Sequence, residues 1–195
     1  MTFRIHNTEI TLRFGFLAVL AFLLTLDGGQ YVLPAVLACA VHESGHILAA
    51  WLCGMHLESI CFGALGIHMA GNTASVSHLR RCVISLAGPL MNFLFFFLFL
   101  PLPMEYRAVQ LILFIFHILP AVPLDGGTAL YSLLCSVMPE ERAAHWCTIL
   151  SIVFALLLGT LGFSILLQSR CNFSLLLAAL YILLYIALKQ RGNLC

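Results

Sequence analysis

Three ionisable side chains stand close together in an otherwise apolar stretch, residues 31–55. They are His42, Glu43 and His46, in the order His-Glu-x-x-His. On a helix, two histidines four residues apart share one face, and two imidazoles on one face can bind a zinc ion. Glu43 is rotated from His42 by about 100°, so it suits a base acting on a water better than a third ligand. The motif predicts zinc-dependent hydrolysis, the alternative being a histidine pair that hydrogen-bonds to neighbouring helices.

A zinc site with two histidines needs a third protein ligand, and Asp125 is the candidate. It lies in residues 120–127, which read Pro-Ala-Val-Pro-Leu-Asp-Gly-Gly. Two prolines remove backbone donors and two glycines permit unusual backbone angles, so we expect an irregular segment here. At membrane depth such backbone is tolerated where it lines a buried or wet cavity. The alternative is that Asp125 caps a helix beginning at Gly126 or Gly127.

One further polar side chain stands out in the next apolar stretch. Asn92 lies in Gly88-Pro-Leu-Met-Asn92 and is followed by a run rich in phenylalanine. Its amide can donate to a substrate carbonyl or an oxyanion, or it can tie two helices together. Gly88 allows close approach of a neighbouring helix.

The composition places these residues in a membrane protein. Of 195 residues, 62% are hydrophobic and 9% are charged, and the net charge is +1. A soluble domain has about a quarter charged residues, and a nucleic-acid binder needs a basic surface, so both classes are excluded. We predict an all-α polytopic membrane protein with about six transmembrane helices. The apolar runs are residues 14–26, 31–55, 82–104, 108–138, 147–168 and 173–188.

Two stretches with β-branched and aromatic residues predict short strands at the membrane edge: a hairpin at residues 2–13 and a strand region at 55–77. We expect residues 1–195 to form a single membrane-embedded domain, in which the first run is a retained helix rather than a signal peptide. With six spans, basic residues concentrate on the side of the N-terminus. This bias predicts a multi-pass protein of the cell membrane with both termini in the cytoplasm.

The three motifs together resemble the site-2 protease family of intramembrane zinc metalloproteases. The resemblance implies one Zn²⁺ per chain, with His42, His46 and Asp125 as ligands and Glu43 as the catalytic base. It also implies a substrate that is a membrane protein or is tethered to the membrane, and strands near residues 61–69 that pair with the unwound substrate. The plan is similar to the stage IV sporulation protein FB branch, without the nucleotide-sensing domain of that branch.

One residue departs from the family pattern. His117 stands three residues before Pro120, where the family usually has asparagine. A histidine there can hydrogen-bond the substrate, contact the metal or serve only in packing. The competing functions are a membrane metal transporter that uses the same ligands and an inactive scaffold. We expect the protein to contact the lipid bilayer and to bind no nucleic acid. A regulatory membrane protein is compatible with the sequence, which does not define an oligomeric state.

Overall fold

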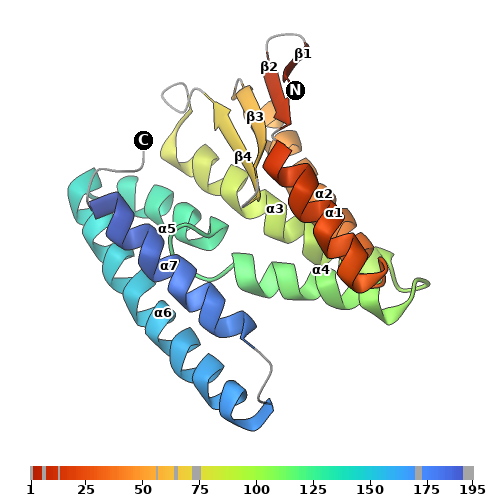
Figure 1. Cartoon of the computed structure of the whole chain (residues 1–195). Coiled ribbons are helices and arrows are strands. Elements are labelled where there is room, and N and C mark those ends of the chain that lie inside the picture. The colour runs from red at the N-terminus through yellow and green to blue at the C-terminus, as the bar shows by residue number, and fades with distance from the viewer. Residues whose placement is uncertain are drawn as a thin grey trace. The chain divides into compact units, whose positions relative to one another are not determined.

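The structure is a computed structural model that describes residues 2–5, 8–12, 14–55, 57–63, 66–71, 76–169 and 173–190 (Figure 1). The chain divides into two compact units, Met1–Ile115 and Phe116–Cys195. In chain order, the elements are β1 (Thr2–Ile5), β2 (Thr8–Leu12), α1 (Phe14–Asp27), α2 (Val32–Leu52), β3 (Leu57–Gly63), β4 (Gly66–Gly71), α3 (His78–Leu98), α4 (Met104–His117), α5 (Asp125–Cys135), α6 (Glu140–Ser169) and α7 (Ser174–Gln190). The single-domain assignment stays a prediction.

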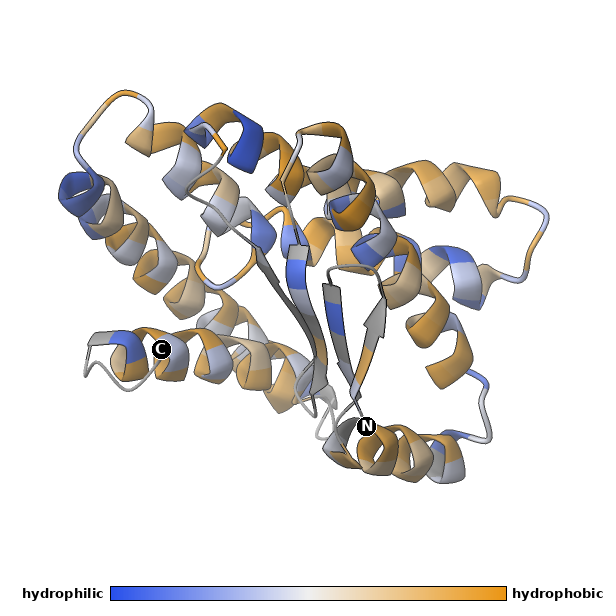
Figure 2. Cartoon of the chain, turned by 90° about the horizontal axis from the view of Figure 1, so that it is seen from above, coloured by the Kyte–Doolittle hydropathy of each residue, from blue (hydrophilic) through white to orange (hydrophobic). Residues whose placement is uncertain are grey.

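The apolar runs correspond to the helices, and the fold is that of an all-α membrane protein with short strands. The fourth run, residues 108–138, forms two helices, α4 and α5, because the prolines and glycines at 120–127 interrupt it. Among the described residues, three helices are long and apolar enough to cross a membrane: Val32–Leu52, His78–Leu98 and Glu140–Gln168, with a shorter apolar helix at Ser174–Lys189. Figure 2 shows hydrophobic residues along the helices. The count of six spans stays a prediction.

A polar turn fixes the start of α2, the helix that carries the His-Glu-x-x-His motif. Asp27 Oδ2 accepts hydrogen bonds from the backbone nitrogens of Tyr31 (2.6 Å) and Val32 (2.8 Å). These nitrogens belong to the first turn of α2, where the helix itself offers no acceptor. Gly28 and Gly29 adopt φ values of 62° and 89°, which suit glycine. The Asp-Gly-Gly sequence therefore ends α1 and starts α2.

Helices α2 and α3 pack closely in the first unit. The buried residues of α2 recur every three or four positions and form one face. They are Pro34, Ala38, Val41, His42, Gly45, His46, Ala49 and Ala50. A Cβ added to Gly45 would lie 2.6 Å from both the Ala87 carbonyl oxygen and Met91 Cγ, so glycine permits this approach. Both motif histidines thus lie on the buried face of α2.

The four strands form one sheet in the order β1-β2-β3-β4. β1 and β2 are antiparallel, β2 and β3 are parallel, and β3 and β4 are antiparallel. The register aligns Phe3, Ile10, Ile60 and Met69 in one row across the sheet. Among the described strands, β1 and β4 are the edges.

Helices α6 and α7 run side by side in opposite directions in the second unit (Figure 1). An apolar core joins them to the segment before α5, and its buried members are Ala121, Leu124, Ala155, Ile182 and Ile186. Gly162 permits close contact, since a Cβ there would lie 2.8 Å from the Leu176 backbone nitrogen. The irregular segment before α5 is thereby packed against two long helices.

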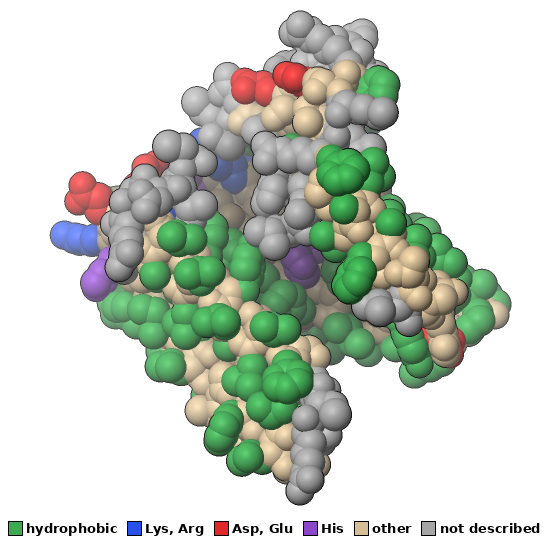
Figure 3. Space-filling view, in the orientation of Figure 1, with side chains coloured by type: hydrophobic (Ala, Val, Ile, Leu, Met, Phe, Trp, Pro, Cys, Tyr) green, Lys and Arg blue, Asp and Glu red, His purple; other side chains and the backbone are tan. Residues whose placement is uncertain are grey.

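Large apolar side chains cover much of the outer surface (Figure 3). Trp51 and Leu52 are 74% and 69% exposed, and many leucines of α6 and α7 are also exposed. A soluble protein rarely exposes contiguous apolar patches of this extent. Lipid is the solvent that such a surface requires.

Candidate metal centre

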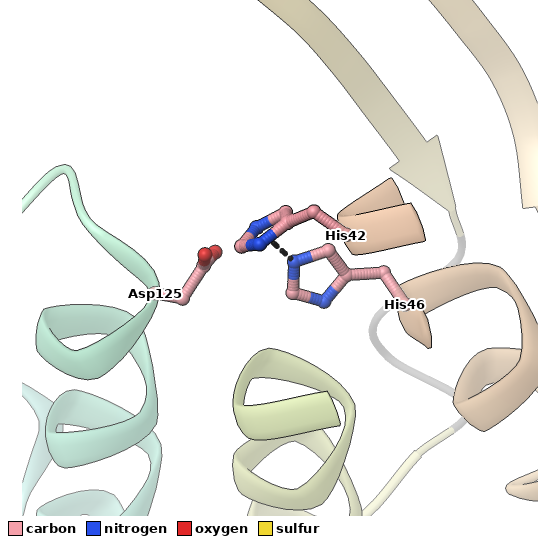
Figure 4. A group of neighbouring side chains, drawn as sticks. All are labelled: His42, His46 and Asp125. Atoms are coloured by element: carbon pink, nitrogen blue, oxygen red, sulfur yellow. Dashed lines mark hydrogen bonds between the residues drawn. The ribbon is translucent and has the colours of Figure 1, made fainter. Parts of the chain in front are cut away.

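The two motif histidines face each other across one turn of α2. Their Nε2 atoms are 3.1 Å apart, and Figure 4 shows this contact as a dashed line. The ring centroids are 4.8 Å apart, with the ring planes at 76°. Both side chains are buried, at 3% exposure for His42 and 7% for His46. Two ring nitrogens therefore converge on one point, as two ligands of a metal ion must.

The backbone of α3 fixes the orientation of His46. His46 Nδ1 lies 2.8 Å from the carbonyl oxygen of Ile84. A carbonyl only accepts, so Nδ1 donates, and the Nε2 of the neutral ring carries a lone pair. Gly88 packs directly against this ring: a Cβ there would overlap Nε2 and lie 2.6 Å from Cε1 and 2.8 Å from Cδ2. The ring is thus held by a hydrogen bond on one side and by close packing on the other.

The spacing of the histidine pair fits zinc. Zinc binds imidazole nitrogen at 2.0–2.1 Å in a tetrahedral arrangement, which separates two such nitrogens by about 3.3 Å. The distance here is 3.1 Å, so a small outward movement of the rings would accommodate the ion. A hydrogen bond from the second ring nitrogen to a backbone carbonyl is a usual feature of zinc-binding histidines. In the first unit, the spacing of the two histidine nitrogens and the hydrogen bond that orients His46 both fit a zinc site.

The other two candidates in the first unit occupy different positions around this pair. Glu43 follows His42 on α2 and is half-buried, outside the buried face of the helix. Asn92 lies on α3, one turn after Gly88, and is fully buried. Its amide nitrogen and oxygen have no hydrogen-bond partner among the described residues. The structure therefore places Asn92 on the same side of α3 as the glycine that contacts His46.

Asp125 and His117 contact each other in the second unit. His117 Nδ1 donates to Asp125 Oδ2 over 2.7 Å. Asp125 is the first residue of α5 (Figure 4), and the N-cap position belongs to Leu124. The interpretation of Asp125 as a cap for a helix beginning at Gly126 or Gly127 is therefore wrong. Its carboxylate instead pairs with the imidazole at the end of α4.

Buried contacts hold the irregular segment that presents Asp125. The Val122 N–H donates to Ser151 Oγ over 2.8 Å, and this hydroxyl donates to the Cys147 carbonyl over 2.6 Å. Ser151 is fully buried on α6. A Cβ on Gly126 would overlap the Ile118 backbone, so the start of α5 lies directly against the preceding segment. These contacts give an irregular backbone a defined position.

Sequence reasoning missed two features of these residues. It did not include orientation of Asp125 among the roles of His117, although eight residues separate the two across a proline-broken segment. It also passed over Gln110, which is fully buried on α4. An amide between Val109 and the apolar residues 111–116 was the available signal.

The comparisons with known proteins identify the family. The model of the Peptidase M50B-like family matches residues 16–125, more than half of the chain. The chain therefore belongs to this family, the site-2 proteases, which are zinc metalloproteases of membranes. The structure is similar to that of a site-2 protease from Methanocaldococcus jannaschii, with a TM-score of 0.64 and 23% sequence identity over 93% of this chain and 91% of the other. Comparison with curated proteins gave no match. The expected family is confirmed; the sporulation branch stays a prediction.

Proposed function

We propose that this protein hydrolyses a peptide bond in or near a transmembrane segment of a membrane-associated protein. His42, His46 and Asp125 (Figure 4) would hold one zinc ion, and these described residues are a set that can do so. The observation that carries the proposal is the pair of Nε2 atoms 3.1 Å apart, with His46 oriented by the Ile84 carbonyl. Zinc, when bound, supplies a Lewis acid that activates water and polarises a carbonyl near neutral pH.

The protein's own residues would bind and orient the substrate and move the proton. Glu43 takes a proton from the attacking water and delivers it to the nitrogen of the departing amine, so the peptide bond breaks without a net change in the enzyme. The Asn92 amide donates a hydrogen bond to the carbonyl oxygen as negative charge develops on it. The place of Asn92 one turn after Gly88, the residue that packs against the His46 ring, supports this role.

His117 would act as a positioning residue for Asp125. The 2.7 Å hydrogen bond to Oδ2 fixes the orientation of the Asp125 carboxylate, and orienting a ligand side chain in this way would favour metal binding. Groups that orient metal ligands in this way contribute about 10- to 100-fold to metal affinity or activity. This role differs from the three that the sequence suggested.

The edge strand β4 would bind the substrate. A transmembrane helix keeps its carbonyls in backbone hydrogen bonds, so the segment to be cleaved must unwind first. An unwound segment can pair with an exposed strand, which satisfies its backbone groups. Among the described strands, Gly66–Gly71 forms an edge of the sheet, whereas β3 lies between β2 and β4. We therefore assign the pairing to β4 rather than to the whole region 61–69.

The direct test replaces Glu43 with glutamine, which keeps the shape of the side chain and removes the base. Membranes from cells producing wild type, Glu43→Gln or Glu141→Gln would be compared by labelling new protein N-termini, and zinc would be measured in each purified protein. Glu141 is exposed at the start of α6 and serves as the matched control. We expect new N-termini within apolar segments for wild type and Glu141→Gln only, with zinc retained in all three.

The same variants distinguish the competing functions. A metal transporter needs its ligands but no base, so Glu43→Gln would still move zinc into proteoliposomes. An inactive scaffold would give identical N-termini for wild type and Glu43→Gln. Either result would overturn the proposed proteolysis.

A further inference from the structure

Two buried carboxamides in the first unit have no hydrogen-bond partner among the described residues. Asn92 on α3 is 0% exposed and Gln110 on α4 is 1% exposed, and both polar atoms of each amide lack a partner there. Arg107, one turn before Gln110, has a buried Nε in the same condition. Leaving a buried polar group unsatisfied costs about 1–3 kcal/mol, so native proteins rarely retain one without a ligand. Water is the usual ligand of such groups.

Two ring contacts join α3 and α4 near these polar groups. The guanidinium carbon of Arg107 lies 5.3 Å from the centroid of the Phe96 ring. Phe96 is one turn after Asn92 on α3, so both side chains lie on the same side of that helix. Nearby, the Phe93 and Phe114 rings are 4.8 Å apart and join the same two helices. These contacts join α3 to α4 beside Arg107, and helical spacing places Asn92 on the Phe96 side of α3 and Gln110 between Arg107 and Phe114 on α4. We call this region the interhelical seam.

The seam leads toward the histidine pair. Gly88 precedes Asn92 by one turn and packs against the His46 ring. In the other direction, Gln110 and Arg107 lead to the start of α4, next to the connection formed by residues 99–103. The groups therefore span from the α3–α4 connection to the edge of the candidate metal centre.

We propose that Asn92, Gln110 and Arg107 bind a file of internal water molecules between α3 and α4. Each amide offers both donors and acceptors, which matches water, and none of the three side chains is a carboxylate that would favour a cation. Near-complete burial of both amides favours small molecules over a peptide in this state. That the file supplies water for peptide hydrolysis rests on the proposed function, while the binding of water does not.

The test is X-ray radiolysis of the full-length protein in H₂¹⁸O, in which hydroxyl radicals formed at bound water label the neighbouring side chains. The ¹⁸O label on Phe96 is compared with that on Phe154, which is also half-buried but packs against the apolar core of the second unit. We expect several-fold more ¹⁸O label on Phe96 than on Phe154. Gln110→Leu should bring Phe96 down to the level of Phe154, and Gln168→Leu, an exposed change on α6, should leave it high.

Two controls make each outcome decisive. Gln110→Met preserves the length of the side chain but removes the amide. If the lost amide rather than repacking lowers the Phe96 label in Gln110→Leu, Gln110→Met must lower it as well. Glu43→Gln must leave the label unchanged, so a failure of the proteolysis proposal is separable from a failure of this one. The proposal is overturned if Phe96 is labelled no more than Phe154 in wild type, or if both Gln110 variants keep the wild-type label.

Discussion

Replacing Gly88 with alanine should remove zinc from the protein while leaving it folded. The added Cβ would overlap His46 Nε2 and lie 2.6 Å from Cε1. Non-bonded carbon atoms prefer about 3.5–4.0 Å, so the ring or the helix must move by roughly 1 Å. Such overpacking costs about 1–3 kcal/mol. A metal–nitrogen bond of about 2.0–2.1 Å tolerates no displacement of that size, so zinc binding is lost before the fold is.

The matched control is Gly159→Ala on α6. Its added Cβ would lie 3.8 Å from the Ala179 Cβ, an ordinary contact, so the change should retain zinc and raise helix stability by up to about 1 kcal/mol. Gly88→Ala gains no such benefit, since a Cβ before Pro89 disfavours the helical conformation. The assay is zinc per chain together with denaturant unfolding in detergent. Wild-type zinc content in Gly88→Ala, or equal zinc loss in both variants, would refute the reasoning.

Two further predictions concern the support of Asp125. His117→Leu should lower zinc affinity about 10- to 100-fold, whereas His117→Asn, which keeps a hydrogen-bond donor, should lower it less. Competition with a chelator measures both affinities. Equal zinc affinity in wild type and both variants would exclude the positioning role. Ser151→Ala should lower the free energy of unfolding by about 1–3 kcal/mol, because the Val122 N–H loses its buried acceptor. Denaturant unfolding measures this against Ser136→Ala, which changes an exposed serine at the end of α5. An unchanged unfolding midpoint would show that water replaces the hydroxyl.

The sequence predicted the family and the fold class because their signals are local. An apolar run long enough to span a bilayer defines a helix without knowledge of its neighbours. The Pro-x-x-Pro-x-Asp-Gly-Gly segment likewise predicts an interruption of the helix, since the proline nitrogen cannot donate a hydrogen bond within a helix. The division of the fourth run into α4 and α5 follows from those residues alone.

The contacts that support the candidate site could not be predicted because they join distant residues. The Ile84 carbonyl that orients His46 lies 38 residues away, and nothing in the spacing marks that carbonyl rather than its neighbours. The acceptor for Val122 lies 29 residues away, on α6. Gln110 escaped notice because an amide is not ionisable, and its importance depends on burial, which its own apolar helix does not reveal. The roles of His42, Glu43, His46 and Asp125 stay predictions.

Zinc content tests the central claim most directly. Wild type, His42→Ala, Asp125→Ala and His145→Ala would be purified in detergent, checked for folding, and measured by elemental mass spectrometry. His145 is exposed on α6 and controls for the loss of a histidine. The account predicts about one zinc per chain in wild type and His145→Ala, as expected for a site of three protein ligands, and loss of zinc in the other two. A folded wild type that binds no zinc, or full zinc in Asp125→Ala, would contradict it.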